Sequence, residues 1–110
     1  MLVRFQRKKQ VISGFVAKGH TGYADHGEDI VCAAVSALTQ TTVIGLQEVA
    51  GIDVDLVVKE GYLECMLPSG FCPKLDDDSQ VILNTLYKGL IAIYEEYGDF
   101  LRIEEVESCE

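Results

Sequence analysis

The chain has 110 residues, a length that fits one domain with its own hydrophobic core. Hydrophobic residues make up 48% and charged residues 25%, a composition that excludes an intrinsically disordered chain. The 18 acidic residues outnumber the 9 basic ones, and the net charge of −9 disfavours a direct nucleic-acid partner and favours a basic protein or peptide.

The first predicted element is a β-hairpin at the N-terminus. Residues 2–6 and 11–17 have strand character, and the polar stretch RKKQ between them fits the turn. The basic cluster at 7–9 is therefore interpreted as a solvated hairpin end. No apolar signal core follows it, and no apolar run approaches the roughly 20 residues that span a bilayer. We expect a cytoplasmic protein without membrane contact.

A helix is predicted from Glu28 to about Leu46. Its acidic start, Glu28 and Asp29, suits the positive end of a helix, and Gly45 is expected to fray or end it. The apolar positions recur at helical spacing: Ile30, Val31, Ala34, Val35 and Leu38.

A second hairpin is predicted over residues 53–67, with its turn at Glu60-Gly61. The alternation gives each strand one apolar face: Val54, Leu56 and Val58, then Leu63, Cys65 and Leu67. A loop follows, and the acidic run 76–78 is typical of a helix start. A cation site is the weaker interpretation of that run.

The second helix is predicted to run to about Tyr97, where Gly98 stops it. Its expected buried stripe is Ile82, Leu83, Leu86, Leu90, Ile93 and Tyr94. Residues 100–106 then form a last, edge strand. The order ββ-α-ββ-α-β predicts an α+β fold, a two-layer sandwich with a mainly antiparallel sheet and two main helices. The strand order does not follow from the pattern, and we expect one domain over residues 1–110.

The stretch GHTGYADHGEDIVCAAVSAL, residues 19–38, holds both histidines and one of the four cysteines. Cys32 is predicted early in the first helix, and His20 lies on the loop before it. Gly19, Gly22 and Gly27 would give that loop freedom to fold over the helix start. The chemistry of such a pair is thiol attack on a carbonyl, with the imidazole taking the thiol proton and later protonating the leaving amine. Backbone N–H groups near the helix start, that of Cys32 included, are candidate oxyanion donors.

Spacing alone leaves other interpretations of these residues open. A cysteine in an apolar stripe is more often small core packing than a nucleophile, and one Cys with one His is a weak signal. The negative charges before Cys32 would disfavour a thiolate there, although Asp29 could instead orient the histidine. His26 is a competing base, and Ser36 lies one turn after Cys32 on the same face.

The remaining cysteines have simpler interpretations. Cys65 is expected in the core, Cys72 in an exposed loop, and Cys109 at the C-terminus. No CxxC pair and no Cys/His spacing suits zinc, so neither a metal nor a cofactor is predicted. A thiol redox protein is disfavoured, because no second cysteine lies near Cys32.

The stretch 19–38 resembles the signature of the bacterial ribosomal-processing cysteine proteases, the Prp family. The shared pattern is a Gly-His pair, a glycine-containing loop, and Gly-x-Asp-Ile-Val-Cys-Ala-Ala-Val-Ser at the head of a helix. The matching residues here are Gly19, His20, Gly27 and the run from Asp29 to Ser36. Thr21 departs from the small residue, often Ala, expected after the Gly-His pair. The motif covers about a fifth of the chain, and its length makes it specific.

The resemblance implies that Cys32 is the nucleophile and His20 the general base, with Asp29 and Ser36 as supporting residues. It also implies a homodimer, a loop that orders on substrate binding, and an apolar groove beside Cys32. The implied substrate is a basic precursor of the twenty-seventh protein of the large ribosomal subunit, cut after a pair of phenylalanines to remove an N-terminal extension. The alternative function is a non-enzymatic, ribosome-associated peptide-binding module.

Overall fold

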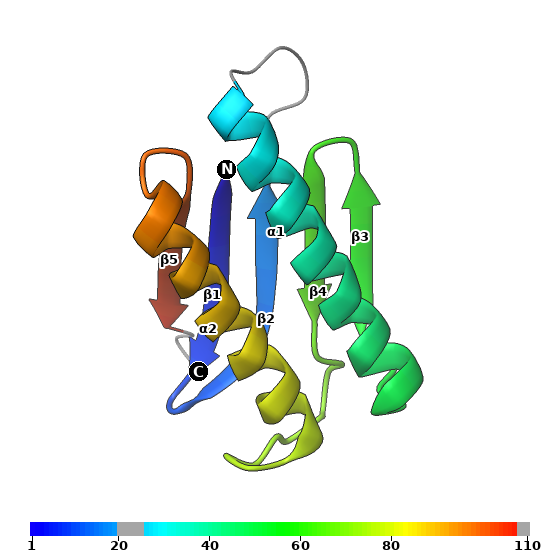
Figure 1. Cartoon of the computed structure of the whole chain (residues 1–110). Helices are drawn as coiled ribbons and strands as arrows, with labels where there is room; N and C mark the ends of the chain where they lie inside the picture. The colour runs from blue at the N-terminus through cyan, green and yellow to red at the C-terminus, as the bar shows by residue number, and fades with distance from the viewer. Residues whose placement is uncertain (20–25, 108–110) are drawn as a thin grey trace.

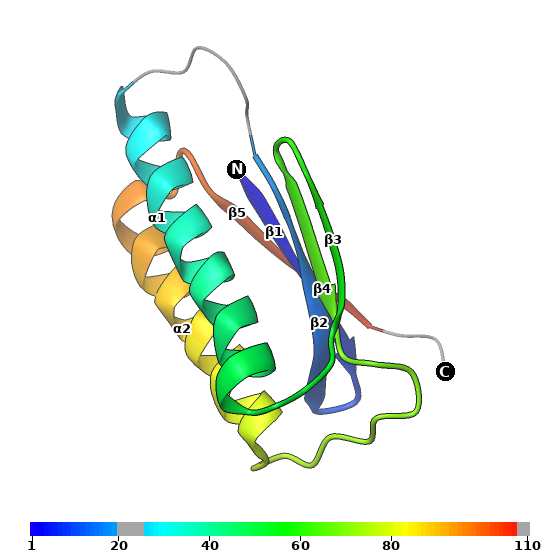
Figure 2. The same cartoon turned by 90° about the vertical axis from the view of Figure 1, so that its right-hand side faces the viewer.

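The structure is a computed structural model that describes residues 1–19 and 26–107. Two antiparallel helices lie side by side on one face of a five-stranded sheet, so the molecule has two layers (Figures 1 and 2). In chain order the elements are β1 (Leu2–Lys8), β2 (Val11–Lys18), α1 (His26–Ile44), the π-helix η1 (Gly45–Val49), β3 (Asp55–Lys59), β4 (Tyr62–Met66), α2 (Asp78–Tyr97) and β5 (Arg102–Glu107). The predicted α+β sandwich in the order ββ-α-ββ-α-β is confirmed.

The strand order of the sheet is β3-β4-β2-β1-β5. Three of the four neighbouring pairs are antiparallel, and only β5 runs parallel to its neighbour β1. The sheet is thus mainly antiparallel, and β5 is an edge strand, as predicted. The other edge is β3, which pairs with β4 alone.

The core lies between the sheet and the two helices. One row of paired residues crosses the sheet beneath the helices: Leu56, Cys65, Phe15 and Phe5. The Phe5 ring meets that of Tyr87 on α2 edge-on, with 5.2 Å between ring centroids. The helices contribute buried aliphatic residues to the same cluster: Val31, Val35, Leu83, Leu86 and Leu90. Burial of this continuous apolar surface is the main force that joins the two layers.

A buried glutamine ties α2 to the first hairpin. The register of β1 against β2 shifts between Gln6 and Arg7, and Ile12 pairs with Arg7 just beyond that shift. On the other side of β2, the pairing with β4 stops at Gly14, so β4 gives the backbone of Ile12 no ladder partner. Gln80, 1% exposed, supplies both bonds: its Oε1 accepts from Ile12 N at 2.8 Å, and its Nε2 donates to Ile12 O at 2.8 Å. This pairing satisfies backbone groups that would otherwise be costly to bury.

The first helix is longer than the sequence indicated at both ends. It begins at His26, two residues before the predicted Glu28, and Gly45 does not end it. The chain continues through Gly45 as the π-helix η1, which ends at Val49. Leu46 within η1 is fully buried, so burial of its side chain favours the helical path beyond the glycine.

The segment from Asp29 to Val49 also corrects the expectation that no apolar run approaches membrane length. Its 21 residues are long and apolar enough to cross a bilayer, judged by length and composition only. The core helix of a globular protein passes the same test. Here Val31, Val35 and Leu46 form a buried stripe against the sheet, as in such a core helix. The absence of membrane contact stays a prediction.

The second helix largely follows its sequence signals. Asp77 is the N-cap, and its side chain accepts a hydrogen bond from Gln80 N at 3.1 Å, so the acidic run does mark the helix start. Gly98 is the C-cap, but in a right-handed conformation, and a Cβ there would lie 3.0 Å from the Tyr94 carbonyl oxygen. The prediction that the Tyr94 side chain is buried is wrong, because Tyr94 is 47% exposed.

Candidate active site

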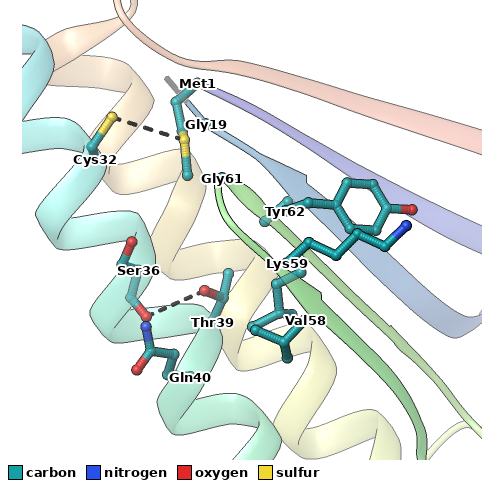
Figure 3. A pocket seen from close by; sticks show the side chains of 12 residues that line it. Met1, Gly19, Cys32, Ser36, Thr39, Gln40, Val58, Lys59, Gly61 and Tyr62 are labelled. Atoms are coloured by element: carbon teal, nitrogen blue, oxygen red, sulfur yellow. Dashed lines mark hydrogen bonds between the residues drawn. The ribbon is translucent and has the colours of Figure 1, made fainter. Parts of the chain in front are cut away.

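Cys32 lines a pocket of about 240 Å³ between α1 and the β3–β4 hairpin (Figure 3). Its side chain is half-buried, whereas Cys65 in the core is 1% exposed. The helix places the thiol on the side that faces the sheet, beside the fully buried Val31 and Val35. Cys32 is therefore positioned as a pocket residue, which separates it from the core cysteine that spacing alone favoured.

The start of the chain closes one side of this pocket. Met1 precedes β1, and its Sδ lies 4.0 Å from Cys32 Sγ (Figure 3). Gly19, at the end of β2, lines the same pocket, and its N–H donates to Gly61 O at 2.9 Å. The residue immediately before His20 thus lies on the pocket wall.

The position of Cys32 in the helix removes one expected source of catalytic assistance. Cys32 follows the first helical residue, His26, by six positions, which is two positions deeper than the predicted start at Glu28 implied. The effect of the helix dipole falls off within the first turn, so it contributes little at this thiol. Only the first four N–H groups of an α-helix lack an internal partner. The N–H of Cys32 is therefore not an available oxyanion donor.

Polar side chains continue the site along α1. Ser36 lies one turn after Cys32 and lines the same pocket, as its spacing predicted (Figure 3). Thr39 follows, and its hydroxyl donates to the carbonyl oxygens of Val35 at 2.9 Å and of Ser36 at 3.2 Å. Gln40 completes this side of the pocket. The helix thus presents a thiol followed by hydrogen-bonding groups.

The opposite wall comes from the β3–β4 hairpin, which contributes the positive charge of Lys59, and Lys18 at the end of β2 lies close by. The ammonium groups of Lys18 and Lys59 lie 6.0 Å and 5.8 Å from the centroid of the Tyr62 ring, within cation–π range. The Tyr62 hydroxyl donates to Glu64 Oε1 at 2.7 Å, and this hydrogen bond is the main reason that the pKa of Tyr62 is raised. The Lys59 side chain points along the Tyr62 ring and away from Cys32 (Figure 3).

An apolar groove adjoins the pocket. It has a volume of about 350 Å³ between the end of α1 and the edge strand β3. Its lining comprises Gln40, Val43, Ile44, Leu56, Val58 and Leu63, and three of these, Gln40, Val58 and Leu63, also line the Cys32 pocket. Leu56 and Val58 face the helices as predicted, yet they are 39% and 65% exposed because β3 lies beyond the cover of α1. An apolar groove beside Cys32, which the resemblance implies, is present.

Only some of the predicted site residues lie together in the structure. Cys32 and Ser36 lie in one pocket with Gly19, and Asp29 is exposed on α1 one turn before Cys32. Gly27, expected in the loop, belongs to the first turn of α1, as does the backbone of His26. The predicted base, His20, and the predicted hinge residue Gly22 lie outside the described residues. Their roles stay predictions.

The other thiols of the described chain match their sequence interpretations. Cys65 is buried in the core, and burial raises its pKa to about 11, so it is an inert thiol at neutral pH. Cys72 is exposed, with Sγ 3.8 Å from Gly70 O. Cys109 lies outside the described residues. Within 1–19 and 26–107, no group of three or more His, Cys, Asp or Glu residues is arranged to hold a metal ion.

Several pocket residues were not recognised from the sequence. Thr39 and Gln40 follow Cys32 and Ser36 at helical spacing, and this polar stripe beside an apolar one was a usable signal. Lys59 and Tyr62 appear in the sequence only as strand ends next to a turn. Met1 gives no local signal at all, because it reaches the site only through the pairing of β1 within the sheet.

Comparison with known proteins gives consistent matches over nearly the whole chain. The family model described as "Cysteine protease Prp" matches residues 1–102. The ribosomal processing cysteine protease Prp of Bacillus subtilis is 30% identical over 103 residues, which cover 92% of this chain and 91% of the relative. The crystal structure of SMU.848 from Streptococcus mutans is 28% identical, with a TM-score of 0.83 over 97% of this chain and 94% of that one. The ribosomal processing protease Prp of S. aureus, solved with a substrate peptide, shares the fold at a TM-score of 0.84 and 22% identity, over 96% of this chain and 98% of that one.

Proposed function

The chain belongs to the Prp family of ribosomal processing cysteine proteases, and we propose that Cys32 is its nucleophile and His20 its general base. The observation that carries this proposal is the placement of Cys32: a half-buried thiol in a pocket that continues into an apolar groove. Membership of a protease family sets aside the non-enzymatic binding module as the alternative.

In the proposed mechanism, His20 takes the thiol proton of Cys32, and the thiolate attacks the scissile carbonyl carbon. The tetrahedral intermediate collapses to an acyl-enzyme as the protonated imidazole gives its proton to the leaving amine. Water, deprotonated by the same imidazole, then hydrolyses the thioester and releases the thiol. Ser36 supports the site from the adjacent turn, and Asp29 helps to orient the imidazole.

The proposed substrate is the precursor of the twenty-seventh protein of the large ribosomal subunit, cut after a pair of phenylalanines to remove its N-terminal extension. Two features support this choice. The groove between α1 and β3 offers apolar surface from Val43, Ile44 and Leu56 for large side chains. The net charge of −9 attracts a basic substrate.

The proposal has further parts, some supported by the resemblance and others by the length and composition of the chain. The enzyme acts as a homodimer, as one cysteine protease domain over residues 1–110, and in the cytoplasm. The glycine-containing loop between β2 and α1 orders when the correct peptide binds, which would make short generic peptides poor substrates. The acidic balance of the chain argues against direct nucleic-acid binding, and no cofactor takes part in the chemistry.

The test is cleavage of the full-length precursor, with the new N-terminus read by mass spectrometry. We expect Cys32→Ser to abolish cleavage while retaining precursor binding, and His20→Ala to lower kcat by roughly 10²–10⁴-fold. Cys72→Ser is the matched control, because that thiol is exposed but lies outside the pocket, and it should cleave at the wild-type rate. Unchanged cleavage by Cys32→Ser would contradict the proposal.

A further inference from the structure

We propose that Met1 is a specificity-determining residue whose side chain forms the adaptable apolar wall against which the substrate residue attached to Cys32 packs. This inference rests on the proposed role of Cys32 as the nucleophile. It starts from one contact: the Met1 thioether sulfur lies 4.0 Å from Cys32 Sγ and lines the same pocket (Figure 3).

The backbone of Met1 is fixed in place, so this contact is a built feature of the fold. Its amino group donates to Phe100 O at 3.2 Å, and its carbonyl oxygen accepts from Arg102 N at 2.9 Å. Both partners precede or begin β5, which pairs with β1 in parallel. The start of the chain is thereby joined to the sheet edge, while its side chain extends toward α1.

Gly19 makes room for the end of the Met1 side chain. A Cβ at residue 19 would lie 2.6 Å from Met1 Sδ, closer than real contacts permit, and 3.0 Å from its Cε. The atoms in conflict are the far end of a flexible side chain, so the thioether could move aside. A glycine at this position therefore lets the methionine occupy its present place beside the thiol.

Because Met1 lies in contact with Cys32, a substrate bound at Cys32 must also meet the Met1 side chain. A carbonyl carbon that Cys32 attacks must come within about 3–3.5 Å of Sγ. The side chain next to that carbonyl then shares the space that Met1 borders, and it either packs on the thioether or displaces it. Methionine suits such a wall, because it is unbranched, polarizable and adaptable to different shapes.

The residues around Met1 determine which substrate side chains fit beside it. Met1, Ala17, Val58 and Leu63 form the apolar part of the pocket, and Ala17 is only 4% exposed. The charged group of Lys59 is directed along Tyr62 and away from the thiol. The residue whose carbonyl is attacked should therefore be apolar, with a size limit that Met1 sets.

The experiment varies Met1 and the substrate together. A cleavable N-terminal fusion that releases residue 1 with a free amino group permits Met1→Ala and Met1→Leu, with melting temperatures as the check on folding. Substrates are precursors carrying leucine or naphthylalanine at the residue whose carbonyl is attacked. We expect Met1→Ala to raise the kcat/KM ratio of naphthylalanine over leucine at least about tenfold. Met1→Leu should stay within about threefold of wild type, because it nearly conserves volume.

A double-mutant cycle distinguishes an effect of the Met1 side chain on substrate choice from general damage to the fold. Gly19→Ala should change the same substrate ratio when Met1 is present, because its Cβ displaces the thioether. The change should vanish in the Met1→Ala background, where no thioether remains to be displaced. Met66→Leu is the matched control: this methionine lies in β4 opposite Gly14 on the outer face of the sheet, and the variant should keep the wild-type ratio.

A second readout does not require protease activity. Alkylation of Cys32 by a bulky aryl maleimide relative to N-ethylmaleimide should become faster in Met1→Ala, as measured by peptide mass spectrometry. If wild type fails to cleave the precursor but this labelling ratio shifts in Met1→Ala, the proposed function is wrong, whereas the role of Met1 as a wall beside Cys32 is supported. If wild type cleaves and both ratios stay unchanged in a folded Met1→Ala variant, the inference about Met1 is overturned.

Discussion

Two cysteines of similar sequence context have opposite environments in this structure. Cys32 and Cys65 each lie among apolar residues in a regular element, but only Cys32 borders a pocket. Cys65 occupies the inward row between Phe15 and Leu56, where burial raises its pKa to about 11. Reactivity of a thiol depends on access and on stabilisation of the thiolate, and Cys65 has neither.

The raised pKa of Cys65 predicts a specific loss of stability at alkaline pH. The unfolded thiol ionises near its ordinary value of 9.0, whereas the folded thiol keeps its proton until about pH 11. The stabilisation is therefore complete below pH 9 and is lost as the pH rises toward 11, because the unfolded chain releases its proton first. Denaturant titrations should give a steeper fall in unfolding free energy from pH 9 to 11 for wild type than for Cys65→Ala.

The comparison uses the slope with pH, so the packing loss of Cys65→Ala does not affect it. Lysines and tyrosines that titrate in the same range are common to both proteins and cancel. Cys72→Ala, which removes an exposed thiol, should keep the wild-type slope. Equal slopes for wild type and Cys65→Ala would show that the buried thiol is not the cause.

Sequence patterns predicted the burial of Cys65, but they could not decide whether Cys32 is a core residue or a pocket residue. Alternation with Leu63 and Leu67 fixed the inward face of β4 for Cys65. Cys32 lies beside the buried stripe of α1, and helical spacing cannot tell a core position from a pocket wall at the border of that stripe. That distinction depends on how far the sheet extends beneath the helix, which is a tertiary property.

The β3–β4 hairpin forms the wall that turns the surface of α1 into a pocket. Its turn places Gly61 at φ +70°, in the left-handed region that favours glycine. The carbonyl oxygen of Gly61 accepts from Gly19 N at 2.9 Å, so the turn is also joined to the end of β2. A change in this turn should therefore reach the Cys32 site.

Gly61→Ala and Gly70→Ala form a matched pair that tests this connection. Both glycines have positive φ, +70° and +85°, and each substitution should cost about 1–2 kcal/mol of unfolding free energy. Gly70 lies in the loop before α2 and away from the pocket, so only Gly61→Ala should also lower kcat/KM for the precursor. Urea titrations and cleavage assays measure the two effects. Equal activities in the two variants would contradict a role for the turn in the site.

Element types and order followed from the sequence, whereas the limits of α1 and the strand order did not. The helical spacing around Val31 and Val35 and the alternation around Leu63 are strong local signals. The continuation past Gly45 depends on burial of Leu46, which is a tertiary contact and overrides local propensity. The parallel pairing of β5 with β1, which carries Met1 to the site, joins the two ends of the chain and leaves no local pattern.

The protein as a whole carries a large excess of negative charge. The chain carries −9 overall, and several of its few basic groups are already engaged. Arg4 pairs with Glu104 at 3.1 Å, Arg7 pairs with Glu105, and Lys18 and Lys59 lie over the Tyr62 ring. The electrostatic field of the protein therefore attracts an approaching basic protein, and this attraction acts before the substrate reaches the cleavage site.

This field predicts that salt weakens cleavage of the full-length basic precursor. Raising NaCl from about 50 mM to about 300 mM shortens the Debye length to well under 10 Å and screens attraction between surfaces not yet in contact. We expect kcat/KM to fall at least about threefold, with most of the change in KM, because steering affects association and not the chemical step. A short, neutral peptide spanning the cleavage site is the control and should lose little. A precursor and a neutral peptide with the same salt dependence would mean that the negative charge of the molecule plays no part in capturing its substrate.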